Sequence, residues 1–68
     1  MTGTVTKLIH AKGFGFIRAP GQSKDIFFHC GALAEELDFS EQLLERRVTF
    51  STIDTNRGPQ ALNIRAAN

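Results

Sequence analysis

The sequence contains no tryptophan and no tyrosine, so phenylalanine is the only one of these three aromatic residue types that it contains. It has a single cysteine, Cys30, which excludes an internal disulfide and fits a reducing cytoplasm. No apolar run approaches the length that a membrane span requires, and residues 1–7 do not read as a signal peptide. We therefore expect a cytoplasmic protein without a membrane segment.

Patterns that carry catalysis or metal binding are missing as well. The cysteine and the two histidines show no CxxC or HxxxH spacing, and no acid–base pair or nucleophile constellation is visible. His29 and Cys30 are adjacent, and neighbours on a strand point to opposite faces, so we interpret Cys30 as a buried, inert thiol. We expect no enzymatic activity, no metal or other cofactor and no small-molecule substrate.

The length of 68 residues predicts one domain, residues 1–68, with a small core. Its hydrophobic content of 41% is ordinary for a globular protein, which argues against disorder. We expect a monomer.

The net charge of +1 hides an uneven distribution. Residues 1–30 carry four basic residues against one acidic residue, residues 31–50 carry two against five, and residues 51–68 carry two against one. The positive charge of the first segment comes from Lys7, Lys12, Arg18 and Lys24. Basic residues therefore accompany the aromatic part of the chain, as a site for a polyanion would require.

Short alternating runs separated by turn residues predict an all-β fold. Val5, Phe28 and Phe50 are the core candidates. The segment 31–46 favours helix by composition, and we expect a long connection there with one or two helical turns between the third and fourth strands. Together these elements predict a five-stranded antiparallel barrel with strands at 3–9, 12–18, 25–30, 47–53 and 60–65.

The stretch 12–29 has an unusual aromatic pattern. Phe14 and Phe16 alternate with two glycines that offer nothing to a core, while Phe27 and His29 share one face of the next strand. If the glycines face inward, three rings stand outward beside basic residues, which suits the stacking of unpaired bases. The alternative is that the phenylalanines are core residues and the glycines mark bulges.

Three segments resemble the cold-shock domain family, whose fold is an oligonucleotide-binding (OB-fold) barrel. Residues 12–17 (KGFGFI) and 25–29 (DIFFH) look like its two ribonucleoprotein-type motifs, and residues 56–61 (NRGPQA) resemble its last turn. The resemblance implies binding of single-stranded RNA or DNA and a role as an RNA chaperone or cold-shock-type regulator. It also implies contacts from Lys12 and Arg57 to phosphates or base edges, and a stacking platform of Phe14, Phe16, Phe27, His29 and Phe39.

The first strand departs from that family. A tryptophan usual there is replaced by Lys7, or by Leu8 if the strand slips by one residue, and Cys30 replaces a second ring. We expect Lys7 to attract phosphates.

His29 could instead be a structural histidine, and Phe39 a core residue beneath the long connection. The missing rings leave open a second function, a protein-interaction barrel with weakened or lost nucleic-acid binding; RNA or DNA preference and base preference also stay open.

Overall fold

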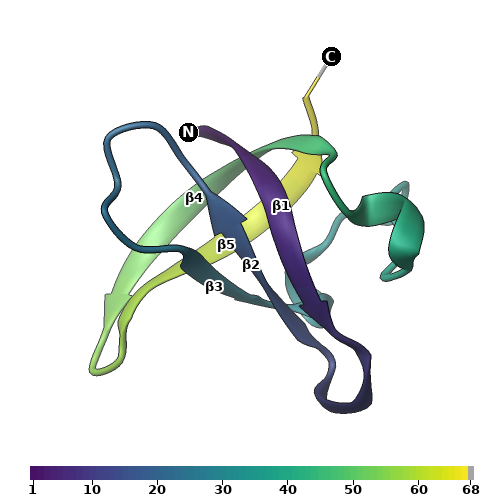
Figure 1. Cartoon of the computed structure of the whole chain (residues 1–68), viewed down its shortest axis with the longest axis horizontal. Helices are drawn as coiled ribbons and strands as arrows, with labels where there is room; N and C mark the ends of the chain where they lie inside the picture. The colour runs from purple at the N-terminus through teal and green to yellow at the C-terminus, as the bar shows by residue number, and fades with distance from the viewer. Residues whose placement is uncertain (68) are drawn as a thin grey trace.

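The computed structural model describes residues 1–67, and five strands form in this range. They are β1 (Thr2–Ile9), β2 (Phe14–Arg18), β3 (Ile26–His29), β4 (Arg47–Thr55) and β5 (Gly58–Ala66). Hydrogen bonds join them in the order β1-β2-β3-β5-β4, and the sheet closes into a barrel (Figure 1). The predicted five-stranded barrel is confirmed. Each strand lies where the sequence places it, and no strand end is shifted by more than two residues.

One feature of the strand pairing was predicted incorrectly. Four neighbouring pairs are antiparallel, but β3 and β5 run parallel, with Phe27 opposite Gln60. An isolated parallel bridge also joins Leu33 to Ile64. The reason is one of parity: strand directions cannot alternate all the way round a closed ring with an odd number of strands. A closed five-stranded barrel must contain a parallel pair, so a purely antiparallel arrangement is impossible.

The connection between β3 and β4 contains two 3₁₀ turns, η2 (Cys30–Ala32) and η3 (Glu41–Leu43), and a third 3₁₀ turn, η1 (His10–Lys12), joins β1 to β2. The predicted helical turns are thus present, each only three residues long. Leu37 and Leu43 are buried in the core and fasten the connection to the barrel. No helix in the described part of the chain is long and apolar enough to cross a membrane.

Backbone hydrogen bonds tie the end of this connection to β1. The Glu45 N–H donates to the Val5 carbonyl at 2.7 Å, and the Val5 N–H donates to the Arg46 carbonyl at 3.1 Å. To make this turn, Glu45 adopts a left-handed conformation with φ at 65°, which favours glycine. Glutamate therefore occupies a left-handed position in the turn before β4.

The barrel interior is apolar, and the predicted core residues Val5, Phe28 and Phe50 are all buried in it. Gly15 is buried opposite Phe28 on the inner face of β2. A Cβ at Gly15 would lie 2.5 Å from the Lys7 carbonyl oxygen and 2.9 Å from the Phe28 ring. The glycine therefore makes room for the phenylalanine. The complete core is Val5, Ile17, Ala19, Ile26, Phe28, Leu37, Leu43, Val48, Phe50, Ala61 and Ile64.

Candidate nucleic-acid interface

Three phenylalanine rings stand together on the outer face of β2 and β3. Phe16 lies opposite Phe27 and Phe14 opposite His29, so strand alternation directs these four side chains to the same face. The ring centroids are 5.2 Å apart for Phe14–Phe27, 5.9 Å for Phe14–Phe16 and 6.1 Å for Phe16–Phe27. All three rings are only half-buried. We call Phe14, Phe16 and Phe27 the aromatic cluster.

The aromatic cluster forms one side of a groove of about 690 Å³. The other side comes from the turn between β4 and β5, which is distant in sequence and brings Arg57 to the same groove. The parallel pairing of β3 with β5 is what places this turn beside the rings. The residues that line the groove are Phe14, Phe16, Phe27, Thr55, Asn56, Arg57, Pro59 and Gln60. Flat apolar rings and a cation thus share one open surface.

Lys7 lies on the outer face of the barrel and Leu8 on the inner side. In the β1–β2 register Lys7 is opposite Phe16, and Leu8 is opposite Gly15 and packs against the core. The register shifts between Val5 and Lys7, which marks a bulge in β1. The strand position next to the aromatic cluster is therefore occupied by Lys7, an exposed cation, rather than by Leu8.

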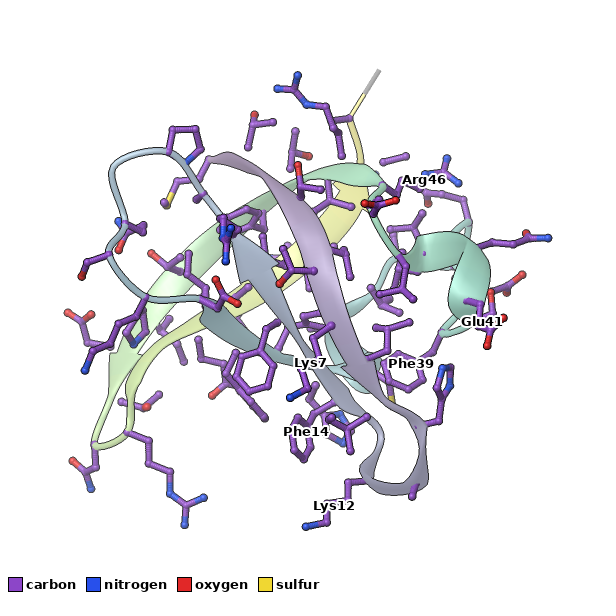
Figure 2. The ribbon with its side chains drawn as sticks, viewed as in Figure 1. Lys7, Lys12, Phe14, Phe39, Glu41 and Arg46 are labelled. Carbon is purple, nitrogen blue, oxygen red and sulfur yellow. The ribbon has the colours of Figure 1, made fainter. Side chains whose placement is uncertain are left out.

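Two further predicted site residues lie near the ends of β2 and β3. Lys12 ends η1 and is exposed, and Figure 2 shows it extending into solvent from the turn between β1 and β2. His29 is also exposed, and its Nδ1 accepts a hydrogen bond from the Gly31 N–H at 3.0 Å. In a neutral imidazole this bond leaves the proton on Nε2, which makes Nε2 a hydrogen-bond donor.

Phe39 lies apart from the aromatic cluster. Its ring centroid is 5.3 Å from that of His10 and 6.4 Å from that of the buried Phe28, and the residue packs against the core. In the view of Figure 2, Phe39 lies on one side of β1 while Lys7 and Phe14 lie on the other. The structure therefore groups Phe14, Phe16, Phe27 and Arg57 around one groove, whereas Phe39 belongs to the connection between β3 and β4 and is partly buried against the core.

Sequence reasoning overlooked the polar contacts at one end of the site. Arg18 forms an ion pair with Asp25, with its Nε 3.4 Å from Oδ1, so this cation is partly neutralised. The Thr6 hydroxyl donates to the other oxygen of Asp25 at 3.2 Å. The groove-lining residues Thr55 and Gln60 were also not anticipated. Their position depends on the parallel β3–β5 pairing, and no short-range sequence signal encodes it.

The side chains of Cys30 and His29 lie closer together than those of neighbouring residues on a continuous strand, which point to opposite faces. The Cys30 Sγ lies 4.0 Å from His29 Nδ1, because β3 ends at His29 and Cys30 begins η2. Cys30 is also only partly buried, whereas the sequence suggested a buried thiol. Within residues 1–67, however, no three histidine, cysteine or acidic side chains gather as they would around a metal ion.

A small closed barrel with partly exposed rings on neighbouring strands is the architecture of the OB-fold class of oligonucleotide-binding domains. Comparison with known sequences is more specific: residues 1–67 match the family described as "'Cold-shock' DNA-binding domain". The chain belongs to the cold-shock domain family. This is a family of nucleic-acid-binding domains without catalytic activity.

Individual relatives agree with this assignment. The chain is 45% identical over 65 residues to the major cold shock protein CspA of Bacillus cereus, covering 94% of this chain and 92% of that protein. It is 35% identical over 66 residues to the cold shock-like protein CspA of Vibrio cholerae, covering 97% and 93% of the two chains. Among solved structures, Drosophila Unr CSD456 superposes with a TM-score of 0.78 at 25% identity. That match covers 98% of this chain but only 26% of the Drosophila chain.

Proposed function

We propose that the chain binds single-stranded RNA or DNA by stacking bases on Phe14, Phe16 and Phe27. The observation that carries this proposal is the groove itself, where three half-exposed rings with centroids 5.2–6.1 Å apart meet Arg57. Aromatic faces accept any base, while cations beside them attract phosphates, so the binding tolerates many sequences. The three clustered rings fit a short footprint of a few nucleotides.

Cations around the groove supply the second part of the mechanism. Lys7 adjoins Phe16, Lys12 lies at the β1–β2 turn and Arg57 lines the groove. In this proposal each contacts a phosphate, and His29 contributes its Nε2–H at the edge of the rings. Phe39 contacts the bound nucleic acid only through the exposed edge of its ring, next to His10, and only if the nucleic acid extends past His29. About three phosphate contacts correspond to a salt slope near −2 for a single strand.

The biological role that fits such binding is that of an RNA chaperone. Stacking unpaired bases favours the open form of an RNA hairpin, because the folded hairpin hides those bases. Moderate affinity lets the protein leave once other factors act on the RNA. In this proposal residues 1–68 act as one domain and as a monomer in the cytoplasm.

A titration with fluorescein-labelled oligothymidine, oligouridine and oligoadenine at two salt concentrations tests the proposal. We expect all three strands to bind, with affinity falling as salt rises, and a labelled RNA hairpin to open at a lower temperature when protein is added. Absence of binding to every oligonucleotide would refute the proposal.

A protein-interaction barrel is the second candidate, and one observation favours it. Lys7 stands on the outer face at the position where the family resemblance implies a tryptophan, so the stacking surface is smaller. A patch of three rings edged by cations could equally dock a protein with an acidic, apolar segment. Failure to bind nucleic acid, combined with retained folding, would favour this candidate.

A further inference from the structure

The turn between β4 and β5 carries Arg57, so its shape decides where that cation lies over the groove. Thr55 is opposite Gly58 in the β4–β5 register, which leaves Asn56 and Arg57 as a two-residue loop. Such loops normally use turns with positive φ at a loop residue, because those turns match the twist of the strands. Here the positive φ falls on Gly58, at 108°, and on neither loop residue. This is the pattern of a hairpin turn that ends in a glycine bulge, in which the glycine after the loop takes the positive φ.

One hydroxyl group braces this loop from within. Thr55 Oγ1 donates a hydrogen bond to the Gly58 carbonyl at 2.6 Å and accepts one from the Arg57 N–H at 3.2 Å. Both bonds are exposed to solvent, so water can replace the hydroxyl without leaving a buried group unpaired. Removing the hydroxyl should thus loosen the loop while the barrel stays folded.

We propose that Thr55 is a positioning residue for single-strand binding, whose hydroxyl holds the backbone of Arg57 beside the aromatic cluster. This inference rests on the proposed function, because it assumes that Arg57 contacts a phosphate of a strand stacked on the cluster. A loop that is already ordered loses less conformational freedom when the strand binds. Thr55 therefore increases affinity through Arg57, although its hydroxyl bonds only to the loop itself.

Three variants isolate the hydroxyl. Thr55→Val removes it and keeps the branched shape, Thr55→Ser keeps it, and Thr49→Val makes the same chemical change elsewhere on β4. Thr49 makes no side-chain hydrogen bond to any residue that the structure describes, and it lies outside the groove. With labelled oligothymidine, we expect Thr55→Val to weaken binding about three- to tenfold, the equivalent of one or two solvent-exposed hydrogen bonds. Thr55→Ser and Thr49→Val should bind within about twofold of the unmodified protein.

A double-mutant cycle with Arg57→Ala shows whether the effect passes through Arg57. In the Arg57→Ala background, we expect Thr55→Val to cause no further loss of affinity. An equal loss in both backgrounds, or no loss in either, overturns the proposal while leaving the proposed function intact. If the unmodified protein binds no oligonucleotide, both are overturned.

A measurement on the free protein provides the readout that does not depend on binding. In Thr55→Val, the Arg57 amide should exchange its hydrogen with solvent several-fold faster in NMR experiments, while amides of β2 and β3 stay unchanged. An unchanged exchange rate of the Arg57 amide would overturn the proposal that the Thr55 hydroxyl holds this loop. Faster exchange throughout the barrel would also overturn it, because Thr55 would then stabilise the fold as a whole.

Discussion

Phe27 and Phe28 are neighbours in the sequence, yet their rings lie on opposite sides of β3. Phe28 is fully buried and fits against Gly15, and its ring lies edge-on to the partly buried ring of Phe39. Phe27 is half-buried and contacts only the two other rings of the aromatic cluster among the aromatic side chains of the described residues. The comparison shows how the twofold period of a strand lets one residue type both fill the core and form a partly exposed surface.

The two sides of β2 and β3 also differ in what their rings contribute to stability. The one inner ring, Phe28, loses all contact with water when the chain folds, whereas the three outer rings keep part of their surface exposed. A chain selected only for folding gains little from three large rings left half in water. The outer rings therefore make physical sense as a surface that is completed by a ligand, and substitutions on each side can separate the two roles.

The largest expected effect is on the inner side. Phe28→Ala should lower the free energy of unfolding by about 3–5 kcal/mol, because it leaves a cavity in a small core. Thermal melts followed by circular dichroism measure this loss. Phe14→Ala is the matched change on the outer face and should cost clearly less. If Phe14→Ala melted at the lower temperature of the two, the assignment of the faces would be wrong.

Adding a methyl group at Gly15, on the inner side of β2, should also destabilise the barrel. Gly15→Ala would bring a Cβ to 2.5 Å from the Lys7 carbonyl and 2.9 Å from the Phe28 ring. The Lys7 carbonyl belongs to the backbone of β1 and cannot move away without distorting that strand. We therefore expect a loss of about 1–3 kcal/mol in unfolding free energy. Gly21→Ala controls for the general effect of the substitution, because a Cβ there would have no atom within 4 Å, although its φ of 82° adds some strain. Equal melting of Gly15→Ala and the unmodified protein would contradict the close fit.

Much of this inner and outer division could be predicted from the sequence. Alternation in residues 12–29 places Phe14, Phe16 and Phe27 on one face and Phe28 on the other, and the register agrees. Strand alternation is a local property, so sequence is sufficient for it. The helical turns of the connection were foreseen for the same reason, although their 3₁₀ form was not.

Features that depend on contacts between distant segments could not be derived in this way. The parallel β3–β5 pair follows from closing an odd-numbered ring, a property of the whole barrel rather than of any segment. The contact of Phe39 with His10 and Phe28 depends on how the long connection folds back. The choice between Lys7 and Leu8 depends on a bulge in β1, which shifts every following side chain by one position.

On the outer side, the main effect should be on binding. Phe27→Ala should weaken single-strand binding by about 1–3 kcal/mol, the usual value of one base stack. Leu44→Ala is the control, because Leu44 is an exposed apolar residue outside the groove. Fluorescence anisotropy with labelled oligothymidine measures both. A loss of the same size in the two variants would show that the groove is not the site of binding.

A smaller effect concerns the cations of the groove. Arg57→Ala should flatten the dependence of log affinity on log salt by about 0.7, the value of one phosphate contact on a single strand. Arg46→Ala removes the same charge from the connection before β4, away from the groove lining, and should leave the slope nearly unchanged (Figure 2). An identical change in both variants would mean that only the overall charge attracts the strand.

The smallest expected effect comes from Lys7, where two contributions oppose each other. Lys7→Trp adds an aromatic face beside Phe16, worth on the order of 1–3 kcal/mol as a base stack, but it removes a phosphate contact. We expect a net gain in affinity of about 1 kcal/mol and a weaker dependence on salt, because stacking is not screened by ions. Leu8→Trp separates position from residue type: Leu8 faces the core opposite Gly15, so an indole there should destabilise the barrel without tightening binding. Anisotropy titrations at two salt concentrations, with folding checked by circular dichroism, measure both variants. If Lys7→Trp folds normally and fails to tighten binding, bases do not stack on this face, and a protein partner becomes the better explanation for the exposed rings.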